Sequence, residues 1–154
     1  MKGMEKHLEK ILLSRPNPPA IDPMTDRTLV AFNLSRAFFR ALKNQAEWAY
    51  SPDGSAVYFD DQVIVQVDGC LCQKSQIDKK GIMGIPLAVI EIDGDSQKSI
   101  CEAYGVGLYF TVELKKKQIQ AYKWENAAYH MIGGGFGSLA INIEETDIFE
   151  GVLC

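Results

Sequence analysis

The sequence predicts an α/β or α+β domain built on one mixed β-sheet, and three observations favour this class. An apolar pattern with helical spacing covers residues 26–46, period-two alternation follows over 57–68, and a nearly continuous apolar run spans 86–92. The strands expected after residue 104 are joined by tight turns, whereas a helix separates them from the buried run. One helical crossover inside an otherwise antiparallel arrangement predicts a mixed central sheet flanked by helices.

Length and composition agree with a single globular domain. The chain has 154 residues, of which 47% are hydrophobic and 23% charged. Its formal net charge of −4 argues against strong non-specific binding to nucleic acid, which depends on Lys and Arg. That charge does not exclude an enzyme that holds a phosphodiester through a divalent metal. No apolar run reaches the roughly 20 residues of a membrane span, and the N-terminus lacks an apolar signal segment, so we expect a cytoplasmic protein.

The N-terminal part is expected to divide into an appendage and the domain. Residues 4–13 predict a short amphipathic helix, and the proline-rich stretch that ends at Pro23 predicts a linker. We therefore expect an appendage over 1–23 and a single domain over 24–154. Thr25 and Asp26 can cap the helix that follows, which is expected to run to about Ala46. Ser51-Pro-Asp-Gly then predicts a turn.

The middle of the chain is expected to supply the central strands. Alternation over 57–67 predicts either one long strand or two strands that meet near Asp60. The polar, glycine-containing segment 69–85 is expected to be a loop. The apolar run 86–92 is typical of a strand that is buried on both faces, and Asp95 or Ser96 can cap a helix that runs to about Tyr104.

The C-terminal third predicts strands over 108–114, 119–124 and 129–132. Turns are expected at the three lysines 115–117 and at Asn126. The glycine-rich segment 133–137 predicts a flexible break before a further segment at 139–143, and a last helical turn is expected to hold Ile148 and Phe149.

The four cysteines do not have the spacing of a structural zinc site. Cys70 and Cys72 are close in sequence, but Cys101 and Cys154 form no second pair, and paired spacings are what such a site requires. We expect reduced thiols in an intracellular protein.

Charged residues inside the predicted strands are the most informative feature for function. Glu91 closes the buried run, and Asp61 shares a strand face with Val63. A carboxylate at a core-facing position costs free energy unless something compensates it. Two such carboxylates on neighbouring strands, with the main-chain carbonyl of Ile92, would form an oxygen site for Mg²⁺. Lys98, in the first turn of the next helix, could orient a water and stabilise charge on a phosphate.

A purely structural interpretation of these residues stays open. Asp61 can be a turn residue between strands, and Glu91 can be a strand-end charge that reaches water. Lys98 and Glu102 are separated by four positions, which allows a surface ion pair on one helix face.

A series of motifs in a fixed order covers about half of the chain. Asp61-Gln-Val-Ile-Val is followed by Pro86-Leu-Ala-Val-Ile-Glu91, and Lys98 then precedes Tyr104-Gly-Val-Gly-Leu-Tyr109 and the hairpin strand Gln118-Ile-Gln-Ala-Tyr-Lys-Trp. In this order the region 57–124 resembles the Uma-type restriction-endonuclease-like family, within the PD-(D/E)XK nuclease superfamily.

The resemblance implies a restriction-endonuclease-like fold and a DNA endonuclease that hydrolyses phosphodiester bonds with Mg²⁺ or Mn²⁺. It implies that Asp61 and Glu91 bind the metal with help from Asp93, and that Lys98 positions the attacking water. Asp60 is an alternative to Asp61 at the first position. A second hypothesis from the same resemblance is a catalytically inactive member that acts as a binding module, and a homodimer is compatible with either.

Overall fold

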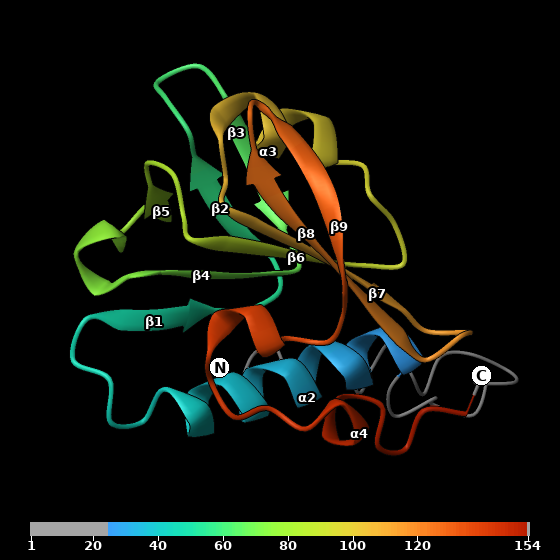
Figure 1. Ribbon diagram of the computed structural model, residues 1–154. Coiled ribbons are helices and arrows are strands. Elements are labelled where there is room, and N and C mark those ends of the chain that lie inside the picture. The colour runs from blue at the N-terminus through green and yellow to red at the C-terminus, as the bar shows by residue number, and fades with distance from the viewer. Residues whose placement is uncertain (1–24, 154) are drawn as a thin grey trace, which may run out of the picture.

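The computed structural model describes residues 25–153, which form two sheets and the helices that cover them (Figure 1). The predicted helix at 4–13 and the proline-rich linker lie outside the described residues. The larger sheet has the strand order β1 (Trp48–Ser51), β4 (Gly69–Gln73), β6 (Ala88–Ile92), β7 (Leu108–Glu113), β8 (Gln118–Glu125) and β9 (Ala128–Gly134). The smaller sheet has the order β3 (Ile64–Val67), β2 (Ser55–Tyr58) and β5 (Ile82–Met83).

The larger sheet is mixed, as the sequence predicts. Its strands pair antiparallel except β6 and β7, which run parallel. Parallel neighbours need a crossover connection, and the helix α3 (Lys98–Tyr104) supplies it. A β-bulge interrupts the β8–β9 pairing next to Ala121 and Tyr122, so β9 carries one extra residue there.

The helix α2 (Asp26–Ala41) packs on one face of the larger sheet. The Thr25 side chain accepts a hydrogen bond from the Thr28 amide (3.2 Å), which confirms Thr25 as the cap. Val30, Leu34 and Phe38 recur at helical spacing and are fully buried. The helix is five residues shorter than the prediction (41 against 46), because residues 42–44 turn the chain toward β1.

Two cores lie on opposite faces of the larger sheet. Ile90 and Ile92 of β6 point into the core beneath α2, whereas Val89 points into the core beneath α3 and the smaller sheet. Figure 1 shows α2 and the short helix α4 (Glu145–Ile148) on one side and α3 with β2 and β3 on the other. All five residues of β6 are buried, which confirms the prediction of a strand covered on both faces.

The prediction of a loop over 69–85 is wrong. This segment contains β4, a 3₁₀ turn at Lys74–Gln76 and β5. The strand β4 begins at Gly69, and the Tyr50 hydroxyl occupies the place where a side chain at 69 would stand. Glycine therefore serves close packing here and does not mark a loop.

The C-terminal predictions are confirmed only in part. Gly133 and Gly134 belong to β9 and do not form a break, and 139–143 forms no strand. Chain reversal there uses a second 3₁₀ turn at Gly137–Leu139, after which α4 buries Ile148 beside α2. In the described part of the chain no helix is long and apolar enough to cross a membrane.

Candidate functional site

Glu91, Thr111 and Gln120 lie in one row across three neighbouring strands of the larger sheet, and Asp68 directly precedes the fourth strand, β4. Gly69, the first paired residue of β4, pairs with Ile90, and the preceding Asp68 accepts a hydrogen bond from the Ile92 amide, so Asp68 lies beside the end of β6 that carries Glu91. Glu91 pairs with Thr111 on β7, and Thr111 pairs with Gln120 on β8. Paired residues of neighbouring strands carry their side chains on the same face. The row therefore follows the α3 side of the sheet, where Glu91 is 5% and Thr111 7% exposed.

The buried Glu91 carboxylate caps the start of α3. Its Oε2 accepts hydrogen bonds from the Ser96 amide (3.0 Å) and hydroxyl (3.3 Å), and its Oε1 accepts one from the Gln97 amide (2.6 Å). Amide groups at a helix start lack partners within the helix and favour negative charge. These bonds compensate the burial of the charge.

Asp68 forms its contacts in the plane of the sheet and toward α2. Its Oδ2 accepts a hydrogen bond from the Ile92 amide (2.7 Å), and its Oδ1 forms a short ion pair with Arg27 in the first turn of α2. Arg27 also pairs with Asp53, in the β1–β2 turn, at 3.4 Å. Burial raises the pKa of the Asp68 carboxyl, and Asp53 adds to this rise, while the Ile92 amide and Arg27 oppose it.

The guanidinium of Arg27 is held between two carboxylates. Burial by itself lowers the pKa of Arg27, but the charges of Asp68 and Asp53 outweigh this effect, so the net shift is upward. Arg27 is a permanent cation at neutral pH. It therefore supplies positive charge to Asp68 from the α2 side of the sheet.

Asp61 does not lie on a strand beside Glu91, and that part of the prediction is wrong. It is exposed in the connection between β2 and β3, which belong to the smaller sheet. The neighbouring Asp60 accepts hydrogen bonds from the amides of Gln62 and Val63 (2.8 Å each) and from the Tyr104 hydroxyl (2.5 Å). Asp60 is therefore bound to the last residue of α3, whereas Glu91 caps the start of that helix.

Asp93 follows β6 but takes part in local structure. Its backbone is left-handed (φ 54°), and its Oδ1 accepts a hydrogen bond from the Leu114 amide at 2.9 Å. A short polar side chain tolerates this conformation. Asp93 therefore links the ends of β6 and β7. The resemblance instead implies that Asp93 helps to bind the metal.

Lys98 lies over the face that carries the polar row. Its Nζ is 3.8 Å from the centre of the Tyr122 ring, a cation–π contact. Tyr122 stands on the same face of β8 as Gln120, two positions along the strand. Glu102, the alternative partner of Lys98, instead accepts a hydrogen bond from the Tyr129 amide (2.8 Å). Lys98 and Glu102 thus have other partners than each other, and the surface ion pair that their spacing allows is not formed.

The cysteines are packed in the core on the α3 side. Cys70, Cys72 and Cys101 are free thiols and completely buried. Among the described residues, no group of three or more His, Cys, Asp or Glu side chains is arranged to hold a metal ion.

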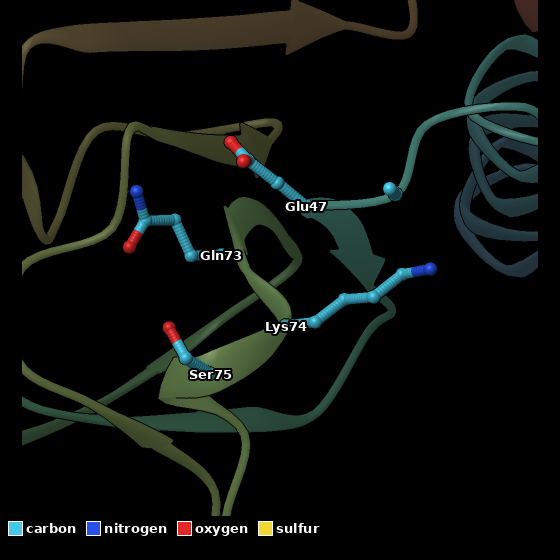
Figure 2. A pocket seen from close by; sticks show the side chains of 5 residues that line it. Glu47, Gln73, Lys74 and Ser75 are labelled. Atoms are coloured by element: carbon cyan, nitrogen blue, oxygen red, sulfur yellow. The ribbon is translucent and has the colours of Figure 1, made fainter.

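A surface hollow of about 410 Å³ lies at the other end of β4 from Asp68. Ala46, Glu47, Gln73, Lys74 and Ser75 line it. Figure 2 shows that the carboxylate of Glu47 and the ammonium of Lys74 extend in opposite directions, so this hollow has no convergent charged groups. The polar row is the better candidate site.

Sequence reasoning missed Asp68 and Arg27. The alternation over 57–68 continues without a break to Asp68, so it conceals the change of sheet between Val67 and Gly69. The available signal was the Asp-Gly step at 68–69, followed by the alternating Cys70-Leu-Cys72. Arg27 had no comparable signal, because its partners are 26 and 41 positions away in the sequence.

Comparison with known proteins reveals a structural likeness. No family model matches the chain, and no curated protein matches it in sequence. A crystal structure from Anabaena variabilis, described as "a putative nuclease belonging to DUF820", superposes with a TM-score of 0.62 over 85% of this chain and 84% of that chain. The two sequences are 14% identical, so the likeness concerns the fold. The chain thus has a mixed α/β architecture of the restriction-endonuclease-like type.

Proposed function

We propose that this protein is a divalent-cation-dependent nuclease that hydrolyses phosphodiester bonds of DNA. The observation that carries the proposal is that Asp68 and Glu91 lie beside the same end of β6, with Thr111, Gln120 and the cationic Lys98 on the face that carries Glu91. Paired carboxylates next to a lysine suit the electrostatic demands of phosphoryl chemistry. The structural neighbour, described as "a putative nuclease", supports the same reaction class.

The donor set fits a magnesium or manganese ion. Mg²⁺ is commonly bound by one or two carboxylates and retains several waters, and Asp68 with Glu91 would supply two. A carboxylate offers about four lone-pair positions. Glu91 uses three for its hydrogen bonds, and Asp68 uses two for the Ile92 amide and Arg27. When bound, such a metal supplies polarisation of a phosphoryl oxygen and a more acidic water.

The other residues of the row would act on the phosphate and the water. The ammonium of Lys98 can donate to a phosphate oxygen and orient a water, as the resemblance implies. Thr111 and Gln120 offer a hydroxyl and an amide on the same face. Asp93 is left out of the proposed ligand set, because its carboxylate is bound to the Leu114 amide.

The test is cleavage of linear and circular DNA in the presence of Mg²⁺ or Mn²⁺. We expect Glu91→Gln and Asp68→Asn each to reduce the cleavage rate by at least about 100-fold, the scale of removing one preorganised electrostatic group. Glu47→Gln is the matched control, because it makes the same chemical change at the opposite end of β4. Asp61→Asn tests the sequence-based assignment: loss of cleavage in that variant, with Asp68→Asn active, would return the role to Asp61.

Lys98 receives a separate test. Lys98→Ala is expected to remove cleavage while Mn²⁺ affinity stays nearly unchanged, since a charged lysine has no lone pair for a metal. Full activity of this variant would exclude Lys98 from the mechanism.

A second candidate function is a non-catalytic binding module of the same fold. The observation that favours it is that both carboxylates already have partners within the protein. This hypothesis predicts DNA or protein binding by the wild type, no cleavage with either cation, and no effect of Glu91→Gln on that binding.

A further inference from the structure

The two proposed ligands have their partners in different elements of the fold. Asp68 pairs with Arg27, which belongs to α2, and its other oxygen bonds to a backbone amide of β6. Glu91 bonds to Ser96 and Gln97, which lead into α3. The two helices cover opposite faces of the sheet (Figure 1). The two carboxylates lie beside the same end of β6 but are held by partners from different helices.

The Arg27–Asp68 contact is a stronger candidate for a regulatory role than the Glu91 cap. The partner of Asp68 is a cation, and a bound metal ion would take the place of that cation. The Asp68 side chain is 16% exposed and that of Arg27 is 45% exposed. The pair is therefore within reach of solvent and of small ions. Asp53, the second partner of Arg27, has a side chain that is 41% exposed, and it also holds the guanidinium in place.

We propose that Arg27 is a positioning residue that competes with a divalent cation for Asp68 and so weakens cation binding to the free protein. This inference rests on the proposed function, in which Asp68 is a metal ligand. A cation that binds Asp68 has to displace the guanidinium or tolerate it as a neighbouring like charge. A phosphate group would offer Arg27 an alternative bidentate partner. Cation binding and DNA binding would then be linked, and each would strengthen the other.

The experiment measures Mn²⁺ and Mg²⁺ affinity of the full chain without DNA, by titration calorimetry and, for Mn²⁺, by electron paramagnetic resonance. Arg27→Gln is expected to bind Mn²⁺ at least about tenfold more tightly than the wild type, through loss of one charge-assisted pair. Arg27→Lys keeps the charge but lacks the bidentate fork and is expected to bind with intermediate affinity. Adding Asp68→Asn to Arg27→Gln should abolish the gain.

Arg36→Gln is the matched control. Arg36 is also on α2 and also pairs with a carboxylate, that of Glu150 at 3.2 Å, but it lies away from the polar row. Its substitution should leave Mn²⁺ affinity unchanged. Circular dichroism and thermal unfolding show whether each variant is folded. If Arg27→Gln is unfolded, the Mn²⁺ affinity of Arg27→Lys is compared with that of the wild type instead.

The outcomes separate the inference from the proposed function. Unchanged or weaker Mn²⁺ binding by folded Arg27→Gln would overturn the competition, even if the wild type cleaves DNA. Tighter Mn²⁺ binding that depends on Asp68, in a protein that cleaves no DNA, would support the competition and exclude the nuclease. A gain that persists in the double variant would also overturn the inference, because the cation would then bind elsewhere.

Discussion

The helices α2 and α3 begin in different ways. The start of α2 is capped by Thr25, its own N-cap residue, and the helix then packs an apolar stripe on the sheet. The start of α3 is capped by Glu91, a strand residue six positions before Gln97, while Gln97 itself makes no side-chain cap. The start of α2 is thus stabilised by a residue next to it in the sequence, whereas the start of α3 depends on a carboxylate from the strand β6. The difference places the stabilising charge of α3 within the candidate site.

The largest expected effect on stability belongs to the α2 side. Phe38 is fully buried, stacks on Tyr50 at 4.4 Å between ring centres and contacts Phe136 edge to face. Phe38→Ala should lower the free energy of unfolding by about 3–5 kcal/mol. The matched control is Phe39→Ala, because Phe39 is 52% exposed on the same helix and its removal should cost less than about 1 kcal/mol. Equal losses in urea unfolding would contradict the packing difference.

Removing the external cap of α3 should have the next largest effect. Glu91→Gln keeps the size of the side chain but removes the charge that accepts two amide bonds and a hydroxyl bond. We expect a loss of about 1–3 kcal/mol in the free energy of unfolding. Amide hydrogen exchange should become faster at Ser96 and Gln97. An unchanged exchange rate would show that the cap does not hold the start of α3.

Removing the local cap of α2 should cost less. Thr25→Ala deletes one neutral hydrogen bond to the Thr28 amide, with an expected loss of about 1 kcal/mol. Chemical denaturation of this variant beside Glu91→Gln compares the two types of cap directly. A larger loss for Thr25→Ala would reverse the proposed ranking.

The smallest effect is a pH dependence at the far end of α3. The hydrogen bond from the Tyr104 hydroxyl, followed by those from the Gln62 and Val63 amides, lowers the pKa of Asp60. A lowered pKa stabilises the fold above the unfolded value of about 3.9, and this contribution is lost as pH falls through the folded pKa. The stability difference between the wild type and Asp60→Asn should therefore shrink below about pH 4. Thermal unfolding from pH 7 to pH 2 measures it, and a constant difference would contradict the assignment.

Local pattern was sufficient for much of the fold. The Thr25 cap, the two strands on either side of Asp60 and the buried strand that ends at Ile92 are all confirmed. Each depends on side-chain periodicity or a capping residue within a short window. The sequence also predicts the helical crossover between β6 and β7, since a turn signal and a helix separate two strand patterns.

Long-range pairing explains what the sequence did not predict. The strand β4 was missed because its glycine and short length resemble a loop, and its burial depends on Tyr50 and β6. Asp68 comes beside β6 only through that pairing. The alternating run that holds Asp61 resembles a strand of the central sheet, whereas β2 and β3 form a separate sheet. The pairing of Arg27 with Asp68 joins elements that no local pattern connects.

The bulge in β9 has a consequence for association between copies of the chain. The strand is the last in its sheet, so its outer edge presents backbone groups to solvent beside the exposed Met131 and Ile132. A flat, apolar edge of this kind is a template for intermolecular strand addition and aggregation. The extra residue of the bulge, together with Gly133 and Gly134, increases local twist and disrupts a regular row of hydrogen-bonding groups. The irregular edge is therefore a poor template for a further strand on the β9 side of the larger sheet.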